Sequence, residues 1–251
     1  MQYTLKKSLG QHFLKDETVC KKIILALQQH QFKNLLEIGA GGGALTKYLV
    51  PIENIYFKTV ELDDEKIMYL QKTFPQLEGK IIHEDFLKVT IPFEDDFAVI
   101  GNFPYNISSQ ILFKILEWKK QVPLLIGMFQ KEVAQRVSAK SGNKQYGILS
   151  VLVQAFYNVE YLFDVSPVCF VPPPKVVSGI IKLQRKNTEY EMRSEKDFFI
   201  LVKTAFNQRR KTLRNATRNL FNEIILQEEI FNQRAEQLTV EQFATLTFKM
   251  K

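Results

Sequence analysis

The tetrapeptide Asn102-Phe103-Pro104-Tyr105 combines residue types that can hold a planar heterocycle bearing an amino group. The Asn side chain is an amide with both an acceptor and a donor. A residue that precedes proline is kept extended, so the carbonyl of Phe103 points in a fixed direction. Tyr105 adds a flat aromatic face for stacking. Asn and Pro are also common turn residues, so an ordinary strand-to-helix turn is the alternative.

An apolar run and a helical pattern flank this tetrapeptide. Residues 97–100 are apolar and predict a buried strand, which Gly101 and Pro104 end. Ser108 is a good helix N-cap, and it precedes apolar residues at helical spacing, which are Ile111, Leu112, Ile115 and Leu116. We therefore expect the tetrapeptide at the carboxyl end of a strand, where open α/β sheets bind their ligands.

A second strand, turn and helix are predicted earlier in the chain, at residues 34–49. The turn fits the pattern G-x-G-x-x-[GA], with Gly39, Gly41 and Ala44 at the defining positions. Such a turn lets a ligand approach the backbone closely at the beginning of a helix. Residues 55–60 predict the next strand, and Glu61 at its end is placed to accept both hydroxyls of a ribose.

Acidic residues around this turn bear on the choice of ligand. Glu37 lies two residues before Gly39, and its negative charge favours a cationic ligand over one that carries a pyrophosphate. S-adenosylmethionine has a ribose, an ammonium and a sulfonium but no phosphate, so we favour it over its rival, a nicotinamide dinucleotide. Asp85 follows a strand expected at residues 80–83 and could accept from an adenine amino group, with Phe86 beside it. A polar turn is the alternative there.

Strands and helices alternate along residues 34–183, which predicts an α/β fold with a mostly parallel sheet. Residues 172–174 are three consecutive prolines, which form a stiff segment and hold Phe170 rigidly in front of it. Phe170 is therefore a candidate second stacking wall for a base. A core aromatic residue is the alternative interpretation.

After Arg185 the pattern becomes helical, and from Asn187 onward the chain contains no glycine or proline. Arg210, Arg214 and Arg218 are spaced by four, which predicts one basic stripe that phosphates can neutralise. A solvated basic face is the alternative. Residues 203–222 contain no acidic residue and six basic ones, which are Lys203, Arg209, Arg210, Lys211, Arg214 and Arg218.

Composition sets the broad class of the protein. The 251 residues, 45% of them hydrophobic, are enough for one large domain, or a large domain with a small appendage. No apolar run reaches about 18 residues and no signal-peptide pattern is present, so we expect a soluble, cytoplasmic protein. Two distant cysteines and three histidines give no zinc pattern. The net charge of +7 favours a polyanionic partner.

In their order along the chain, these motifs resemble the ribosomal RNA adenine N6-dimethyltransferase family, most closely its bacterial small-subunit (KsgA-type) branch. His12 stands where the family often has Asn, and Phe103 stands where it often has Leu. The family's role at Phe103 belongs to the backbone carbonyl, so this change should matter little. The resemblance is carried by Glu61 and by residues 10–14, 36–41, 84–86, 102–105, 170–176 and 208–215.

The resemblance implies a Rossmann-like, S-adenosylmethionine-dependent methyltransferase domain over residues 1–185 and a small helical RNA-binding domain over residues 186–251. The implied substrate is 16S rRNA within the small ribosomal subunit or its precursor. Two adjacent adenosines in its 3'-terminal hairpin loop are each methylated twice, as part of small-subunit biogenesis. The alternatives are a large-subunit rRNA methylase of the macrolide-resistance type and a non-catalytic ribosome-assembly factor. We expect a monomer that binds no metal and no membrane.

The residue patterns and the resemblance together give three groups of candidate site residues. The catalytic group is Asn102, Phe103, Pro104, Tyr105 and Phe170. The cofactor-binding group is His12, Leu14, Gly39, Gly41, Glu61, Asp85, Phe86 and Asn102. The RNA-binding group is Lys6, Lys7, Arg209, Arg210, Lys211, Arg214 and Arg218.

Overall fold

The computed structural model describes residues 12–251, so the candidate residues Lys6 and Lys7 lie outside the described residues. The chain divides into two compact units. The sheet unit contains the described residues up to Ala134 together with Glu160–Arg185, and the helical unit contains Gln135–Val159 and Lys186–Lys251.

The predicted domain boundary after residue 185 coincides with the last of these divisions, whereas residues 135–159 were expected in the first domain. They belong to the helical unit because their helix α6 (Ile148–Phe156) contacts α7 (Glu195–Asn207) and α10 (Val240–Leu246). The assignment of catalysis to one domain and of RNA binding to the other stays a prediction.

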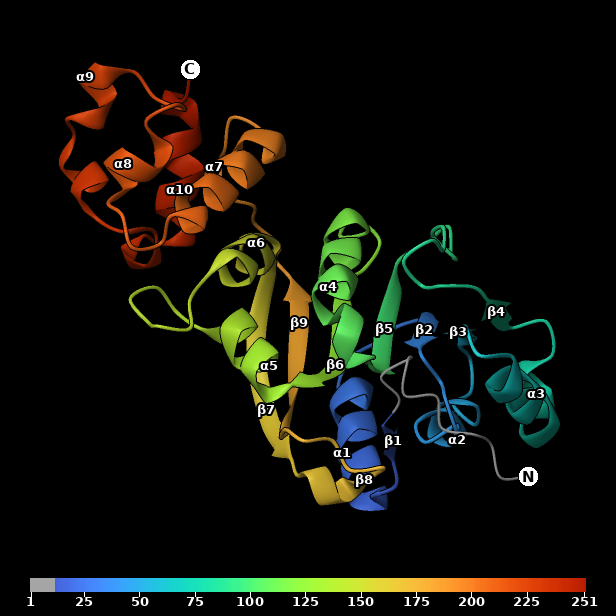
Figure 1. The fold of residues 1–251 in the computed structure, drawn as a ribbon. Helices are drawn as coiled ribbons and strands as arrows, with labels where there is room; N and C mark the ends of the chain where they lie inside the picture. The colour runs from blue at the N-terminus through green and yellow to red at the C-terminus, as the bar shows by residue number, and fades with distance from the viewer. Residues whose placement is uncertain (1–11) are drawn as a thin grey trace. The chain divides into compact units, whose positions relative to one another are not determined.

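The described part of the sheet unit is built on a seven-stranded sheet with the strand order β4-β3-β2-β5-β6-β9-β7 (Figure 1). The first five strands in this order are parallel to their neighbours, and β9 is antiparallel to β6. This confirms the predicted α/β fold with a mostly parallel sheet. The strands are β2 (Asn34–Ile38), β3 (Tyr56–Glu61), β4 (Ile81–His83), β5 (Phe97–Asn102), β6 (Leu124–Gln130), β7 (Tyr157–Val165) and β9 (Ser178–Arg185).

The helices of the sheet unit begin close to the predicted positions. Asp16 caps α1, because its carboxylate accepts from the backbone N–H groups of Thr18 and Val19 at 2.9 and 3.1 Å. Ser108 is not an N-cap but the first residue of α4, and its hydroxyl donates to the Tyr105 carbonyl at 3.1 Å. These helices are α1 (Glu17–Gln28), α2 (Thr46–Leu49), α3 (Asp64–Thr73) and α4 (Ser108–Glu117), and α5 (Lys131–Ser138) begins in this unit and ends in the helical unit.

A small antiparallel pair of strands, β1 (Phe13–Leu14) and β8 (Phe170–Val171), was not predicted. Phe13 pairs with Val171 and Leu14 pairs with Phe170, and the Lys15 N–H extends the ladder to the Cys169 carbonyl at 2.9 Å. The pair joins the segment before α1 to the segment before the three prolines, so two of the sequence motifs are held together.

The helical unit contains α6, α7, α8 (Leu213–Thr217), α9 (Glu223–Leu226) and α10 around buried aromatic rings. Phe206 packs against Phe243, and Phe221 packs against Phe231, with ring centroids 5.9 and 4.9 Å apart. The helical pattern is interrupted here, because α7 ends at Asn207 and a turn separates it from α8.

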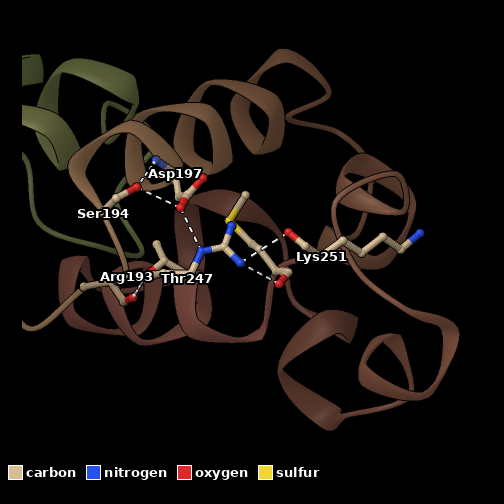
Figure 2. Close-up of polar contacts among 7 residues, drawn as sticks. Arg193, Ser194, Asp197, Thr247 and Lys251 are labelled. Atoms are coloured by element: carbon tan, nitrogen blue, oxygen red, sulfur yellow. Dashed lines mark hydrogen bonds and ion pairs between the residues drawn. The ribbon is translucent and has the colours of Figure 1, made fainter.

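Arg193 joins the beginning of α7 to the last residues of the chain (Figure 2). Its guanidinium contacts the Asp197 carboxylate at 2.8 Å and donates to the Met250 carbonyl at 2.7 Å, while its backbone N–H donates to the Thr247 hydroxyl at 2.8 Å. The hydrogen bond from Arg193 lowers the pKa of Asp197, and a further bond from the Ser194 hydroxyl adds to this effect. These contacts hold the last residues of the chain against the beginning of α7.

Candidate active site

A cavity of about 270 Å³ lies at the carboxyl ends of β2, β3 and β5. This is the edge at which open α/β sheets bind ligands, and it matches the prediction for the tetrapeptide. Of the twelve different residues in the catalytic and cofactor-binding groups, every one except Phe170 lines the cavity. The described residues that line it include His12, Phe13, Leu14, Glu37, Gly39, Gly41, Glu61, Leu62, Glu84, Asp85, Phe86, Asn102, Phe103, Pro104 and Tyr105.

The glycine turn has the conformation that its sequence predicts. Gly39 and Gly41 have positive φ angles of 72° and 53°, which L side chains rarely adopt. A Cβ atom on Gly41 would lie 2.9 Å from the Phe13 ring, so the turn also needs the missing side chain. However, α2 has only four residues and begins at Thr46. The helix is therefore short, but its beginning lies beside the cavity, because the Lys47 N–H donates to the Gly43 carbonyl at 3.2 Å and both Ala44 and Leu45 line the cavity.

Glu61 ends β3 beside this turn and is held by three backbone N–H groups. Its Oε2 accepts from Gly41 at 2.9 Å, and its Oε1 accepts from Leu62 and Asp63 at 2.9 and 3.0 Å. A carboxylate has about four acceptor positions, so about one remains open on Oε2. The structure therefore leaves Glu61 an acceptor position toward the cavity, and its contact with both ribose hydroxyls stays a prediction.

Glu37 lies at the floor of the cavity and is buried, with only 2% of its surface exposed. Its Oε2 accepts from the Thr46 hydroxyl at 2.7 Å. Burial raises the pKa of Glu37 to about 8, and the neighbouring Glu61 carboxylate adds to the rise. The negative charge predicted from the sequence is therefore largely neutralised at pH 7 until a cation lies beside it.

Asp85 and Phe86 lie at the end of the cavity that follows β4. Asp85 Oδ1 accepts from the Leu87 N–H at 3.0 Å, which fixes the carboxylate and leaves Oδ2 for another donor. Phe86 is buried, and its ring contacts the edge of Trp118 with centroids 5.4 Å apart. The pair presents an acceptor beside an apolar wall, which is the arrangement predicted for an adenine ring with its amino group.

Asn102 is the last residue of β5, and its side chain has a fixed orientation. Its Nδ2 donates to the backbone carbonyl of His12 at 2.9 Å, which leaves Oδ1 as the acceptor at the cavity. The His12 ring is also held, because Nδ1 donates to the Pro172 carbonyl at 2.9 Å. His12 thus connects the β1 segment, the Asn102 amide and the proline segment.

The Phe103 side chain points into the protein rather than into the site. It is 1% exposed, and its ring packs against Phe129 with centroids 4.9 Å apart. The ring fits because the neighbouring strands carry glycine at this level: a Cβ on Gly101 or Gly127 would lie 2.6 or 2.1 Å from it. Only the backbone of Phe103 is left to act at the cavity, as the sequence predicted.

Tyr105 is half-buried, and its hydroxyl hydrogen-bonds the hydroxyl of Ser178 at the beginning of β9. Burial raises the pKa of Tyr105. Its ring lies next to that of His12, with centroids 5.6 Å apart and planes tilted by 32°. Ser178, the first residue of β9, was missed from the sequence.

Phe170 is the candidate that the structure places elsewhere. It is 1% exposed and belongs to the hydrophobic core with Leu14 and Val165, and it does not line the cavity. The pairing of β8 with β1 directs this ring inward, next to its partner Leu14. In this structure Phe170 is therefore the core aromatic residue that was the alternative interpretation, and His12 is the ring that faces Tyr105.

The basic residues of the RNA-binding group are distributed differently from the predicted stripe. Arg209 contacts Glu236, with Nε 3.8 Å from the carboxylate, and Arg214 Nε donates to the Leu226 carbonyl at 2.8 Å. Arg210, Lys211 and Arg218 are exposed. The residues at spacing four do not share one helix, because Arg210 lies in the turn between α7 and α8.

The charged residues that line the cavity indicate which cofactor it can hold. Four carboxyl groups line it, from Glu37, Glu61, Glu84 and Asp85, and no lysine or arginine does among the lining residues of the described chain. A dinucleotide needs partners for its phosphates, whereas a nucleoside that carries positive charge is attracted by carboxylates. The residues present therefore fit S-adenosylmethionine.

Two solved structures have the same fold. A dimethyladenosine transferase from Plasmodium falciparum matches with a TM-score of 0.77 and 26% identity, over 94% of this chain and 96% of that one. The 23S rRNA methyltransferase ErmE matches in fold with a TM-score of 0.70 and 21% identity, over 94% and 99% of the two chains. The fold and the acidic cavity at the carboxyl edge of its sheet are those of a Rossmann-like methyltransferase.

The family follows from the sequence comparisons. Residues 2–250 match the model of the family described as "Ribosomal RNA adenine dimethylase", and the chain belongs to this family. A relative from Cytophaga hutchinsonii, named ribosomal RNA small subunit methyltransferase A, is 52% identical over 96% of this chain and 95% of its own. A relative of the same name from Flavobacterium johnsoniae is 52% identical over 98% and 95%.

Within residues 12–251, no helix is long and apolar enough to cross a membrane. The same residues contain no group of three or more His, Cys, Asp or Glu side chains that could hold a metal ion.

Proposed function

We propose that the chain dimethylates N6 of two adjacent adenosines in the 3'-terminal hairpin loop of 16S rRNA, in the small ribosomal subunit or its precursor. Family membership supports the chemistry, with S-adenosylmethionine as the methyl donor. The names of the relatives at 52% identity support the small subunit as the substrate. The observation that carries the proposal is the Asn102 amide, whose acceptor oxygen is oriented at an acidic cavity.

The cofactor, when bound, supplies an electrophilic methyl group on a sulfonium. The chain's carboxyl groups attract this positive charge, with Glu37 at the cavity floor and Glu61 beside the glycine turn. Asp85 offers Oδ2 to the amino group of the cofactor's adenine, and Phe86 covers the ring. The contacts are made by the backbone and by buried side chains, so little is left to be ordered on binding.

For the target base, the chain's task is to orient a poor nucleophile. The lone pair of adenine N6 is delocalised into the ring, and N6 attacks well only when it becomes pyramidal. The Asn102 Oδ1 and the Phe103 carbonyl each accept one N6–H, which favours this geometry, and Tyr105 stacks on the ring. Asn102 Oδ1 and the Phe103 carbonyl would thus aim the N6 lone pair at the methyl group that the cofactor would supply, and the N6 proton would be lost to water. Positioning provides the catalysis, and the base must leave its helix to be positioned.

Two other functions were kept open by the sequence. A large-subunit methylase shares this chemistry and differs only in its RNA; the likeness to ErmE, at 21% identity, supports a common fold and not a common substrate. A non-catalytic assembly factor would not need an oriented amide at a cofactor cavity, so the geometry at Asn102 speaks against it.

The test is methyl transfer from labelled S-adenosylmethionine to unmethylated small subunits and to unmethylated large-subunit rRNA in parallel, with the product nucleosides identified by mass. We expect dimethyladenosine in the small-subunit sample alone. Product in the large-subunit sample alone would support the proposed methyl transfer but show that the substrate is large-subunit rRNA. No product in either, with RNA still bound, would support the assembly factor.

A further inference from the structure

Two exposed basic segments of the helical unit lie side by side. The basic loop is residues 140–144, between α5 and α6, and the basic turn is residues 208–212, between α7 and α8. Arg209 of the basic turn donates from its guanidinium to the Lys144 carbonyl, and the Gly142 N–H donates to the Glu236 carbonyl at 2.7 Å. Arg209 Nε also lies 3.8 Å from the Glu236 carboxylate, so one network holds both segments.

The basic loop has a defined backbone of its own. Gln154 Nε2 donates to the Val137 and Ala139 carbonyls, both at 2.8 Å, and so ties the end of α5 to α6. Within the loop, the Asn143 N–H donates to the Lys140 carbonyl at 3.2 Å, and Asn143 Oδ1 accepts from the Gln145 N–H at 2.8 Å. Gly142 has a φ angle of +83°, which suits glycine. The loop is therefore shaped before any ligand arrives.

The two segments present positive charge that the described structure leaves uncompensated. Lys140, Lys144, Arg210 and Lys211 are exposed, and none of the four forms an ion pair with another described residue. The Glu236 carboxylate, which belongs to the network that holds the two segments, already faces Arg209. Like charges held close together repel one another, so this surface gains from a ligand that carries several negative charges.

We propose that the basic loop and the basic turn form one surface that binds the phosphates of the RNA substrate. This inference rests on the proposed function and adds the basic loop, Lys140 and Lys144 in particular, to its RNA contacts. RNA fits better than an acidic protein because the residues between these cations are Ser141, Gly142 and Asn143, and the surface lacks the apolar centre of a protein interface. A loop with a fixed backbone and exposed cations can bind the phosphates of an RNA strand. Such contacts fix the position of the RNA without recognising its sequence.

The test compares the wild-type protein with the double variant Lys140→Gln/Lys144→Gln, in binding to a protein-free transcript of the 3'-terminal region of small-subunit rRNA. Lys196→Gln is the matched control, since Lys196 is an exposed lysine on α7 of the same unit. Affinity is measured over a series of salt concentrations, and thermal unfolding checks that the variants are folded. The network of the loop uses backbone groups and the side chains of Arg209, Gln154 and Asn143, so Gln at 140 and 144 leaves it intact.

The slope of log K against log salt is negative, and we expect its magnitude to decrease by about one for each lysine replaced. The double variant should bind roughly 10- to 100-fold more weakly near 0.1 M salt. The control should keep the wild-type slope. An unchanged slope in the folded double variant would overturn the inference. So would a loss of binding seen on intact subunits but not on protein-free RNA, because the surface would then contact a protein.

The proposed function and this inference fail in different ways. If the wild-type protein methylates small-subunit rRNA and the double variant binds RNA as the wild-type protein does, the function stands and the surface is wrong. If the wild-type protein methylates no RNA while its RNA affinity depends on Lys140 and Lys144, the surface stands and the proposed reaction is wrong.

Discussion

The side-chain amide of Asn102 donates to the backbone carbonyl of His12 at 2.9 Å, and this single bond decides which end of the amide faces the cavity. We predict that Asn102→Ala lowers the single-turnover rate of methyl transfer on the order of a hundredfold or more, because N6 loses its oriented acceptor. Binding of S-adenosylhomocysteine, followed by calorimetry, should remain measurable. Transfer near the wild-type rate would contradict the role of Asn102.

His12→Ala is the matched control for this prediction. The bond to Asn102 uses the backbone of His12, so removal of the ring keeps the amide oriented. It removes the bond from Nδ1 to Pro172 and the ring contact with Tyr105. Its effect on the rate should therefore be smaller than that of Asn102→Ala.

Gly127 and Phe103 are coupled by packing. A Cβ at Gly127 would lie 2.1 Å from the Phe103 ring, in the middle of the sheet. We predict that Gly127→Ala lowers the free energy of unfolding by about 1–3 kcal/mol, as overpacking does. The double variant Gly127→Ala/Phe103→Leu should recover part of this loss, because Leu is shorter than Phe. Denaturant unfolding measures the free energy of unfolding of both variants. An unchanged midpoint for Gly127→Ala would contradict the prediction and show that the Phe103 ring can adopt another conformation.

The hydrogen bond between Tyr105 and Ser178 should fix the stacking face. We predict that Tyr105→Phe and Ser178→Ala each raise KM for RNA by a few-fold, and that the double variant is no worse than either single variant. Each substitution removes the same bond, so their effects should not add. Additive effects in the double-mutant cycle would mean that the two hydroxyls act separately.

Glu37 should make folding stability depend on pH. Its pKa is about 8 in the folded protein against an ordinary 4.5, so the folded state keeps a proton that the unfolded state releases. Stability contributed at this residue therefore falls as pH rises from about 4.5 and is lowest above about 8. Glu37→Gln has no proton to lose and should gain stability relative to the wild-type protein between about pH 6 and pH 9. A difference that does not change with pH would contradict the raised pKa.

Local sequence patterns predicted the elements that bring the site together. The apolar run before Asn102 became β5, and the glycine pattern with Glu61 became the turn and the end of β3, because each depends on residues close in sequence. Phe170 was misplaced because pairing between β8 and β1 decides where its ring points, and those strands are distant in sequence. The partners of Asn102 and Tyr105 were missed for the same reason.

The prediction of one basic stripe was wrong for a different reason. Arg210, Arg214 and Arg218 have helical spacing, but α7 ends at Asn207, and the isolated bridge from Thr212 to Arg234 holds the chain in a turn before α8. Periodicity alone could not reveal this contact. It also could not reveal that Arg209 is used to hold the basic loop.

The most direct measurement is the mass of the 3'-terminal fragment of small-subunit rRNA after complete reaction with the wild-type protein. We predict that the fragment gains four methyl groups and that fragmentation places two on each of two adjacent adenosines. The same fragment treated with Asn102→Ala, for only the time that the wild-type reaction needs, should gain almost none. Methyl groups on other nucleosides, or on large-subunit rRNA instead, would contradict the proposed function.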